Sequence, residues 1–142
     1  MSHHTLYERL GKGPAITAVV DDFVARCAAD SRINGKFART DIGRLKEKLV
    51  EQISAATGGK VQYTGRSMAE THHDMQVTAG EFDALVEDLV ATLNQFGVSE
   101  KSQGELLSIL GTLRGDIVEI ESAETETPLP SSYEPAKPLA AV

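Results

Sequence analysis

The chain has 142 residues, 41% of them hydrophobic and only 5% aromatic, which is enough for one domain with a largely aliphatic core. Its formal net charge of −7 argues against nucleic acid and anionic membrane surfaces as partners. A single cysteine, Cys27, excludes an internal disulfide and a zinc site built from several thiolates, and no apolar run approaches the roughly 20 residues of a membrane span. We therefore expect a cytoplasmic protein.

Helical periodicity runs along most of the chain, and no segment has a convincing strand pattern. The first predicted helix covers Pro14 to Ala29, because apolar residues recur along one face of it. These residues are Ile16, Val19, Val20, Phe23, Val24 and Cys27. Residues 30–35 break the pattern, and Phe37 follows in the turn.

The next helix is predicted to begin at Asp41, whose carboxylate can accept hydrogen bonds from free backbone N–H groups, and to end at Gly58-Gly59. Its apolar stripe consists of Ile42, Leu45, Leu49, Ile53 and Ala56. Residues 60–66 indicate a loop. Ser67, with Glu70 three residues later, then predicts the start of a short helix that contains His72.

Two longer helices complete the predicted domain, which ends at residue 120. Thr78 and Glu81 have the spacing of a capping box, and the amphipathic helix that they begin should stop at Gly97. The last helix should run from Ser99 to Ile120; it contains glycines at 104, 111 and 115, for which we expect close packing to compensate. Residues 121–142 hold four of the five prolines and predict a disordered tail.

Few residues in this chain can carry chemistry. There is no Gly-rich phosphate loop, no nucleophilic serine motif and no HExxH pair. The histidines form two adjacent pairs, His3-His4 and His72-His73. Neighbours on a helix diverge by about 100°, so at most one of His72 and His73 faces inward. His72 stands between two helices with wide apolar faces, where an iron porphyrin would fit.

Four segments carry a family resemblance that spans residues 5–120. They are TLYERLGKGPAI (5–16), DDF (21–23), RLKEKLVE (44–51) and GGKVQYTGRSMAETH (58–72). In order and spacing they resemble the group I truncated haemoglobins, whereas Gly11-Lys12 departs from the double glycine usual in that family. The resemblance implies an all-α fold, a two-over-two helical sandwich that encloses haem b.

The resemblance also assigns roles to individual residues. His72 matches the proximal iron ligand, Phe37 the phenylalanine that stacks on the porphyrin, and Lys48 a lysine that pairs with a haem propionate. Tyr63 lies in the loop that leads to the proximal helix. The remaining residues expected to contact haem are Phe23, Val24, Leu45, Leu49, Ile53 and Met68.

The distal side departs from the family pattern. Relatives usually place a tyrosine and a glutamine where this chain has Val24 and Leu49. A charge-assisted hydrogen bond to bound oxygen is worth about 1.5–3 kcal/mol, so its absence predicts fast oxygen release. Three alternatives stay open: Gln52 turns toward the ligand, Lys48 binds iron as a sixth ligand, or Met75 meets the iron.

Two functions remain compatible with the sequence. The first is reversible binding of diatomic gases (O2, CO, NO) at ferrous iron by a monomer, as an oxygen store, carrier or sensor. The second is an enzyme that converts NO to nitrate with oxygen and needs an external reductase. A helical interaction module without haem is a third hypothesis, which an absorption spectrum would test.

Overall fold

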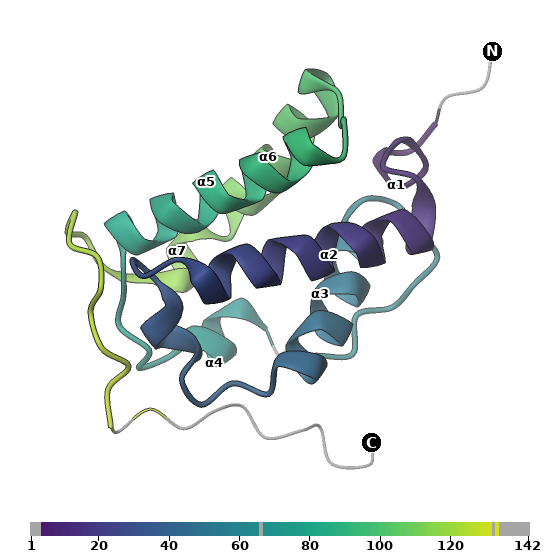
Figure 1. Cartoon of the computed structure of the whole chain (residues 1–142). Coiled ribbons are helices and arrows are strands. Elements are labelled where there is room, and N and C mark those ends of the chain that lie inside the picture. Colours follow the sequence, from purple (N-terminus) through teal and green to yellow (C-terminus); the bar gives the residue numbers. More distant parts are fainter. Residues whose placement is uncertain (1–3, 66, 132, 134–142) are drawn as a thin grey trace.

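The computed structural model describes residues 4–65, 67–131 and 133. Its elements follow one another along the chain as helices with one small pair of strands (Figure 1). In chain order they are α1 (Leu6–Arg9), α2 (Lys12–Ala29), the 3-10 helix η1 (Asn34–Phe37), α3 (Ile42–Ala56), α4 (Met68–His72), β1 (Val77–Thr78), α5 (Ala79–Gln95), α6 (Glu100–Thr112), α7 (Arg114–Ile117) and β2 (Val118–Ile120).

The long helices form two pairs that pack across each other. Helix α2 contacts α3 on one side and α5 on the other, and α5 is followed by α6, which runs back beside it (Figure 1). The short helix α4 lies at the lower end of the molecule and contacts α7 (Figure 1). The predicted all-α, two-over-two arrangement is confirmed. No helix within the described part of the chain is long and apolar enough to cross a membrane.

The predicted helix starts depend on local hydrogen bonds, and these bonds are present. Asp41 Oδ1 accepts from the Arg44 amide at 3.1 Å, and Ser67 Oγ accepts from the Glu70 amide at 3.1 Å. Thr78 and Glu81 form a complete capping box. The first long helix begins earlier than expected, at Lys12, directly after Gly11 in a left-handed conformation (φ 100°).

The last predicted helix is wrong beyond Thr112. The chain turns at Leu113, forms α7, and continues as β2, which pairs in parallel with β1 through Val77 and Val118. The expectation of no strand is therefore also wrong. The packing proposed for the glycines of α6 is absent too, since a Cβ added at Gly104 or Gly111 would meet nothing within 4 Å.

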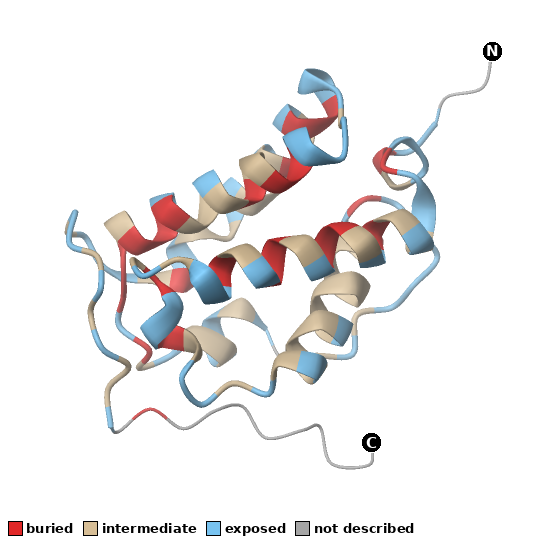
Figure 2. Cartoon of the chain, in the orientation of Figure 1, coloured by how far each residue is buried: buried red, intermediate tan, exposed pale blue. Residues whose placement is uncertain are grey.

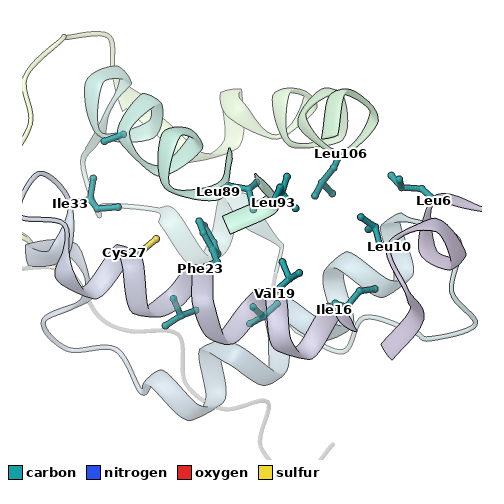
Figure 3. Close-up of a cluster of buried hydrophobic side chains, with 13 residues drawn as sticks. Leu6, Leu10, Ile16, Val19, Phe23, Cys27, Ile33, Leu89, Leu93 and Leu106 are labelled. Atoms are coloured by element: carbon teal, nitrogen blue, oxygen red, sulfur yellow. The ribbon is translucent and has the colours of Figure 1, made fainter. Parts of the chain in front are cut away.

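The core is centred on α2. Its buried residues Ile16, Val19, Val20, Phe23 and Cys27 form one cluster with Leu89 and Leu93 of α5 and Leu106 of α6. Figure 3 shows Phe23 and Cys27 pointing from α2 toward the side of α5. Helix α3 differs, because Ser54 is its only buried residue and its predicted apolar stripe is half-buried, except for Ala56, which is exposed (Figure 2). An amphipathic helix with an incompletely covered apolar face indicates a space beside it.

The segment after Ile120 is a further correction. Residues 121–131 and 133 do not form a free tail but run along the domain, held by hydrogen bonds to α5, β1 and residues 32–39. The composition of this segment predicts disorder because it offers little apolar surface, whereas the contacts that hold it are mainly polar. Residue 132 and residues 134–142 of the predicted tail, and His3, lie outside the described residues.

Candidate functional site

A large cavity of about 610 Å³ lies between α2, α3, α4 and the start of α5. Such a volume is typical of sites that enclose a small molecule or cofactor. Most of its wall is apolar and comes from several elements. These apolar residues include Phe23 and Val24 of α2, Phe37 of η1, Leu45 and Leu49 of α3, Met68 of α4, and Phe82 and Leu85 of α5.

His72 is the last residue of α4 and lines this cavity. Its Nδ1 lies 2.8 Å from the backbone oxygen of Met68, one helical turn earlier. Because a carbonyl oxygen can only accept, Nδ1 carries the proton and Nε2 is left with a free lone pair. Burial lowers the pKa of His72, while the bond to Met68 opposes this shift. The ring is therefore a neutral imidazole prepared to bind a metal through Nε2.

The loop that follows His72 is held in an unusual conformation. Asp74 and Gln76 both have positive φ, 66° and 57°, which costs energy for residues other than glycine. The Glu119 carboxylate stabilises this loop, accepting from the Asp74 amide at 3.0 Å and the Gln76 amide at 2.6 Å. β2 therefore does more than pair with β1: it carries the side chain that fixes the end of α4.

Lys48 lines the cavity on α3, but its amine already has partners. Nζ donates to Thr64 Oγ1 at 2.7 Å and lies 3.5 Å from Glu51 Oε2. Glu51 accepts from the Thr64 hydroxyl at 2.6 Å and from the Thr64 amide at 2.9 Å, and these two bonds lower the pKa of Glu51. The three residues attach the loop that carries Tyr63 to α3. Iron ligation by Lys48 would require both of its contacts to break.

Two arginines accompany Lys48 at the cavity. Arg39 is exposed and Arg44 is half-buried. With Lys48 they supply positive charge at a mainly apolar cavity, and such side chains can pair with the carboxylates of a bound group.

The structure brings together nearly all of the residues predicted to contact haem. The cavity wall includes Phe23, Val24, Phe37, Leu45, Lys48, Leu49, Tyr63, Met68 and His72. Ile53 is the exception: it is not among the cavity-lining residues and packs against the core beneath α2. Gln52 and Met75 also line the cavity, so the side chains considered as alternative ligands are close to it.

Several residues of the cavity were missed by sequence reasoning. Lys36 and Glu81 are buried, at 4% and 2% exposure, and their charged groups lie 3.8 Å apart. Tyr133 is 5% exposed and lines the cavity from the segment that was predicted to be disordered. The sequence signal for Tyr133 was an aromatic side chain inside a proline-containing stretch. Its contacts could not be predicted, because its partners are distant in the sequence.

Comparisons with known proteins agree with this geometry. The sequence profile of the bacterial-like globins matches residues 5–119. A group 1 truncated haemoglobin from Synechocystis sp. is 37% identical over 111 residues, covering 75% of this chain and 90% of that protein. The chain belongs to the bacterial-like globin family, among the group 1 truncated haemoglobins. A second such relative, from Mycolicibacterium paratuberculosis, is 32% identical over 84% of this chain and 88% of its own length.

Solved structures agree with the sequence relatives. The truncated haemoglobin of Tetrahymena pyriformis in its Fe(III) form has a TM-score of 0.78 and 31% identity, over 81% of this globin and 98% of that chain. The 2/2 haemoglobin of Synechococcus sp., with covalently attached haem, has a TM-score of 0.77 and 34% identity over the same shares. Membership of this family implies a haem-containing, gas-binding protein.

The residues that line the cavity fit a haem group. The cavity supplies an apolar wall, one neutral imidazole with a free Nε2, and cations where carboxylates could lie. Cys27 also lines the cavity, but burial raises the pKa of its thiol to about 12, so it remains a protonated, weakly polar group.

Proposed function

We propose that this globin binds haem b through His72 and uses it to bind diatomic gases, O2, CO or NO, reversibly in an apolar distal pocket. The observation that carries the proposal is the His72 ring, whose Nδ1 is bonded to the Met68 carbonyl at the wall of a mainly apolar cavity. When bound, ferrous haem would supply an open iron position for a gas molecule.

On the proximal side the chain holds the imidazole in one tautomer. The 2.8 Å bond from Nδ1 to Met68 makes Nε2 the binding atom and restricts rotation of the ring. Arg39, Arg44 and Lys48 offer positive charge for the haem carboxylates. In this assignment Lys48 shares its amine between a propionate, Thr64 and Glu51, instead of reaching the iron.

On the distal side, the chain offers little to hold a polar ligand. Val24, Leu45 and Leu49 are apolar, and they stand where the family resemblance places the ligand. Without a charge-assisted bond of about 1.5–3 kcal/mol, oxygen should leave roughly ten- to a hundredfold faster than from a pocket with such a donor. CO is less polar when bound and depends less on that bond.

The first test is the absorption spectrum of the purified, reduced protein with and without CO. We expect a strong haem band that shifts on CO binding. His72→Ala should remove or displace this band, whereas His73→Ala should keep it, because His73 is the exposed neighbour. A protein that takes up no haem, or a His72→Ala variant that keeps the wild-type spectrum, would contradict the proposal. A six-coordinate spectrum lost in Lys48→Ala would contradict the role given to Lys48.

A second test concerns the ligand. Leu49→Gln introduces an amide donor on α3 and should slow oxygen release by about ten- to a hundredfold. Leu49→Met keeps the wall apolar and should leave the rate near that of the wild type. Stopped-flow displacement of oxygen by CO measures both rates. Equal rates in the two variants would show that position 49 does not face the ligand.

The alternative function is conversion of NO to nitrate with the help of an external reductase. A measurement of catalytic turnover distinguishes it from reversible gas binding. Fast oxygen loss would leave few oxygen-loaded molecules to meet NO, which favours reversible binding as the main role. Sustained NO consumption by the oxygenated protein with a reductase would instead support the enzyme. A monomer in a reducing, cytoplasmic compartment agrees with the buried, unpaired Cys27.

A further inference from the structure

The segment of residues 121–131 and 133, here called the strap, lies beyond the part of the chain that matches the globin family. The family profile ends at residue 119. The strap leaves β2 and passes close over the start of α5, where the Gly80 amide donates to Ser122 O at 2.9 Å. A Cβ at Gly80 would lie only 2.3 Å from Ala123 O, so the strap needs a glycine at this crossing.

The middle of the strap is bonded to two buried charged residues. Thr127 donates to Glu81 Oε2 from its amide at 3.0 Å and from its hydroxyl at 2.7 Å. Lys36 Nζ donates to Pro128 O at 3.0 Å and to Met75 O at 2.9 Å. A single buried ammonium group therefore joins the strap to the loop that follows His72.

The end of the strap reaches α4 itself. Arg39 donates to Pro130 O at 2.7 Å, and its guanidinium lies 5.7 Å from the centre of the Tyr133 ring. Tyr133 is buried and packs with Met75 and Ile117. Its hydroxyl donates to Thr71 O at 3.1 Å. Thr71 directly precedes His72, and its carbonyl lies in the last turn of the helix, where carbonyls need partners from outside.

Helix α4 depends on such contacts for its position. It has five residues, of which Met68, Thr71 and His72 are half-buried and the other two are exposed. An isolated helix of this length is unstable in water, so tertiary contacts must hold it. We propose that the strap is a working part of the haem site and that Tyr133 is a positioning residue, which fixes α4 and closes the proximal wall of the cavity. The proposal rests on the haem-binding function given above.

The experiment compares the full-length wild type with Tyr133→Phe, Tyr133→Ala and the matched control Tyr7→Phe. The Phe variant removes only the hydroxyl that bonds to Thr71, and the Ala variant also removes the ring from the wall. Tyr7 lies on α1, away from the cavity-lining residues. Three quantities are measured: amide exchange of residues 68–76 in the haem-free protein, the rate of haem transfer to excess apomyoglobin, and the iron–histidine stretching band of the reduced protein.

We expect Tyr133→Phe to exchange amides 68–76 faster and to release haem roughly twofold to tenfold faster than the wild type, the range expected for one lost hydrogen bond. Tyr133→Ala should release haem more than tenfold faster, and both variants should shift or broaden the iron–histidine band, which reports the setting of His72. Tyr7→Phe should match the wild type in all three measurements.

The proposal is overturned if Tyr133→Phe matches Tyr7→Phe in exchange, haem release and the iron–histidine band. If Tyr133→Ala fails to fold, the Phe variant alone decides. Failure of the haem-binding function would be recognised separately, because the wild type would then take up no haem. Amide exchange in the haem-free protein would still report whether Tyr133 holds α4.

Discussion

The buried pair Lys36–Glu81 offers the sharpest test of how the cavity is held together. The perturbation is Glu81→Gln, which keeps the size of the side chain and removes its charge. Both oxygens of Glu81 accept from N–H groups: Oε1 from the Thr78 amide at 3.0 Å and Oε2 from the Thr127 amide at 3.0 Å. A carboxamide has only one acceptor oxygen, so its NH2 group must face one of these donors.

The expected loss of unfolding free energy follows from these contacts. Removing one partner of a buried ion pair typically costs about 3–5 kcal/mol, because the other charge stays buried without compensation. Lys36 keeps its three carbonyl partners, Met75 O, Gln76 O and Pro128 O, which places the loss near the lower end, at about 3 kcal/mol. For a chain of this length that loss lowers the melting temperature by roughly 6–12 °C.

The assay is urea unfolding of the haem-free protein followed by far-ultraviolet circular dichroism. Glu87→Gln is the matched control, because Glu87 is on the same helix, pairs with Arg32 at 3.2 Å and is 67% exposed. Glu87→Gln should lower the free energy of unfolding by less than about 1 kcal/mol. In the double variant Lys36→Met/Glu81→Gln, the free energy of unfolding should fall by less than the sum of the falls in the two single variants. If Glu81→Gln is as stable as Glu87→Gln, the reasoning about the buried pair is wrong.

Three further predictions concern other parts of the chain. Burial and the neighbouring Asp30 raise the pKa of Asp88 from 3.8 to about 7. The free energy of unfolding should therefore fall as pH rises between these values. Chemical unfolding at pH 5 and pH 8 should show this fall in the wild type and not in Asp88→Asn. The Cys27 thiol, with a pKa of about 12, should react with iodoacetamide at pH 8 far more slowly in the native than in the unfolded protein. Gly104→Ala and Gly111→Ala, both in open space on α6, should each raise the free energy of unfolding by about 0.5–1 kcal/mol in the same urea assay; a loss in either variant would contradict the open space.

The features that sequence predicts well are those decided by neighbouring residues. Asp41, Ser67 and Thr78 each bond to a backbone amide three positions later, so the residue type and its spacing are sufficient to place a helix start. The stripe on α3 was correct except for Ala56, which is exposed. What periodicity could not tell is that Leu45 and Leu49 line a cavity, while Ile42 and Ile53 pack against the core.

The features that sequence missed depend on residues far apart in the chain. Tyr133 bonds to a residue 62 positions away, and Lys36 to one 92 positions away. Prolines with small polar residues normally indicate disorder. That expectation fails for residues 121–131 and 133, because Lys36, Arg39 and Glu81 bond to them from distant parts of the chain. His72 was found through its family resemblance, whereas its bond to Met68 required the structure.

The two sides of the cavity differ in construction. In the proposed assignment the distal wall is formed by the apolar side chains of Val24 on α2 and of Leu45 and Leu49 on α3. The proximal side consists of a short helix and a strained loop that are fixed by Lys36, Glu119 and Tyr133. A polar substitution on the distal wall should therefore change ligand rates with little effect on the retention of haem. A substitution of Lys36, Glu119 or Tyr133 should mainly raise the rate of haem release. It should change the rates of gas binding only by changing the position of His72.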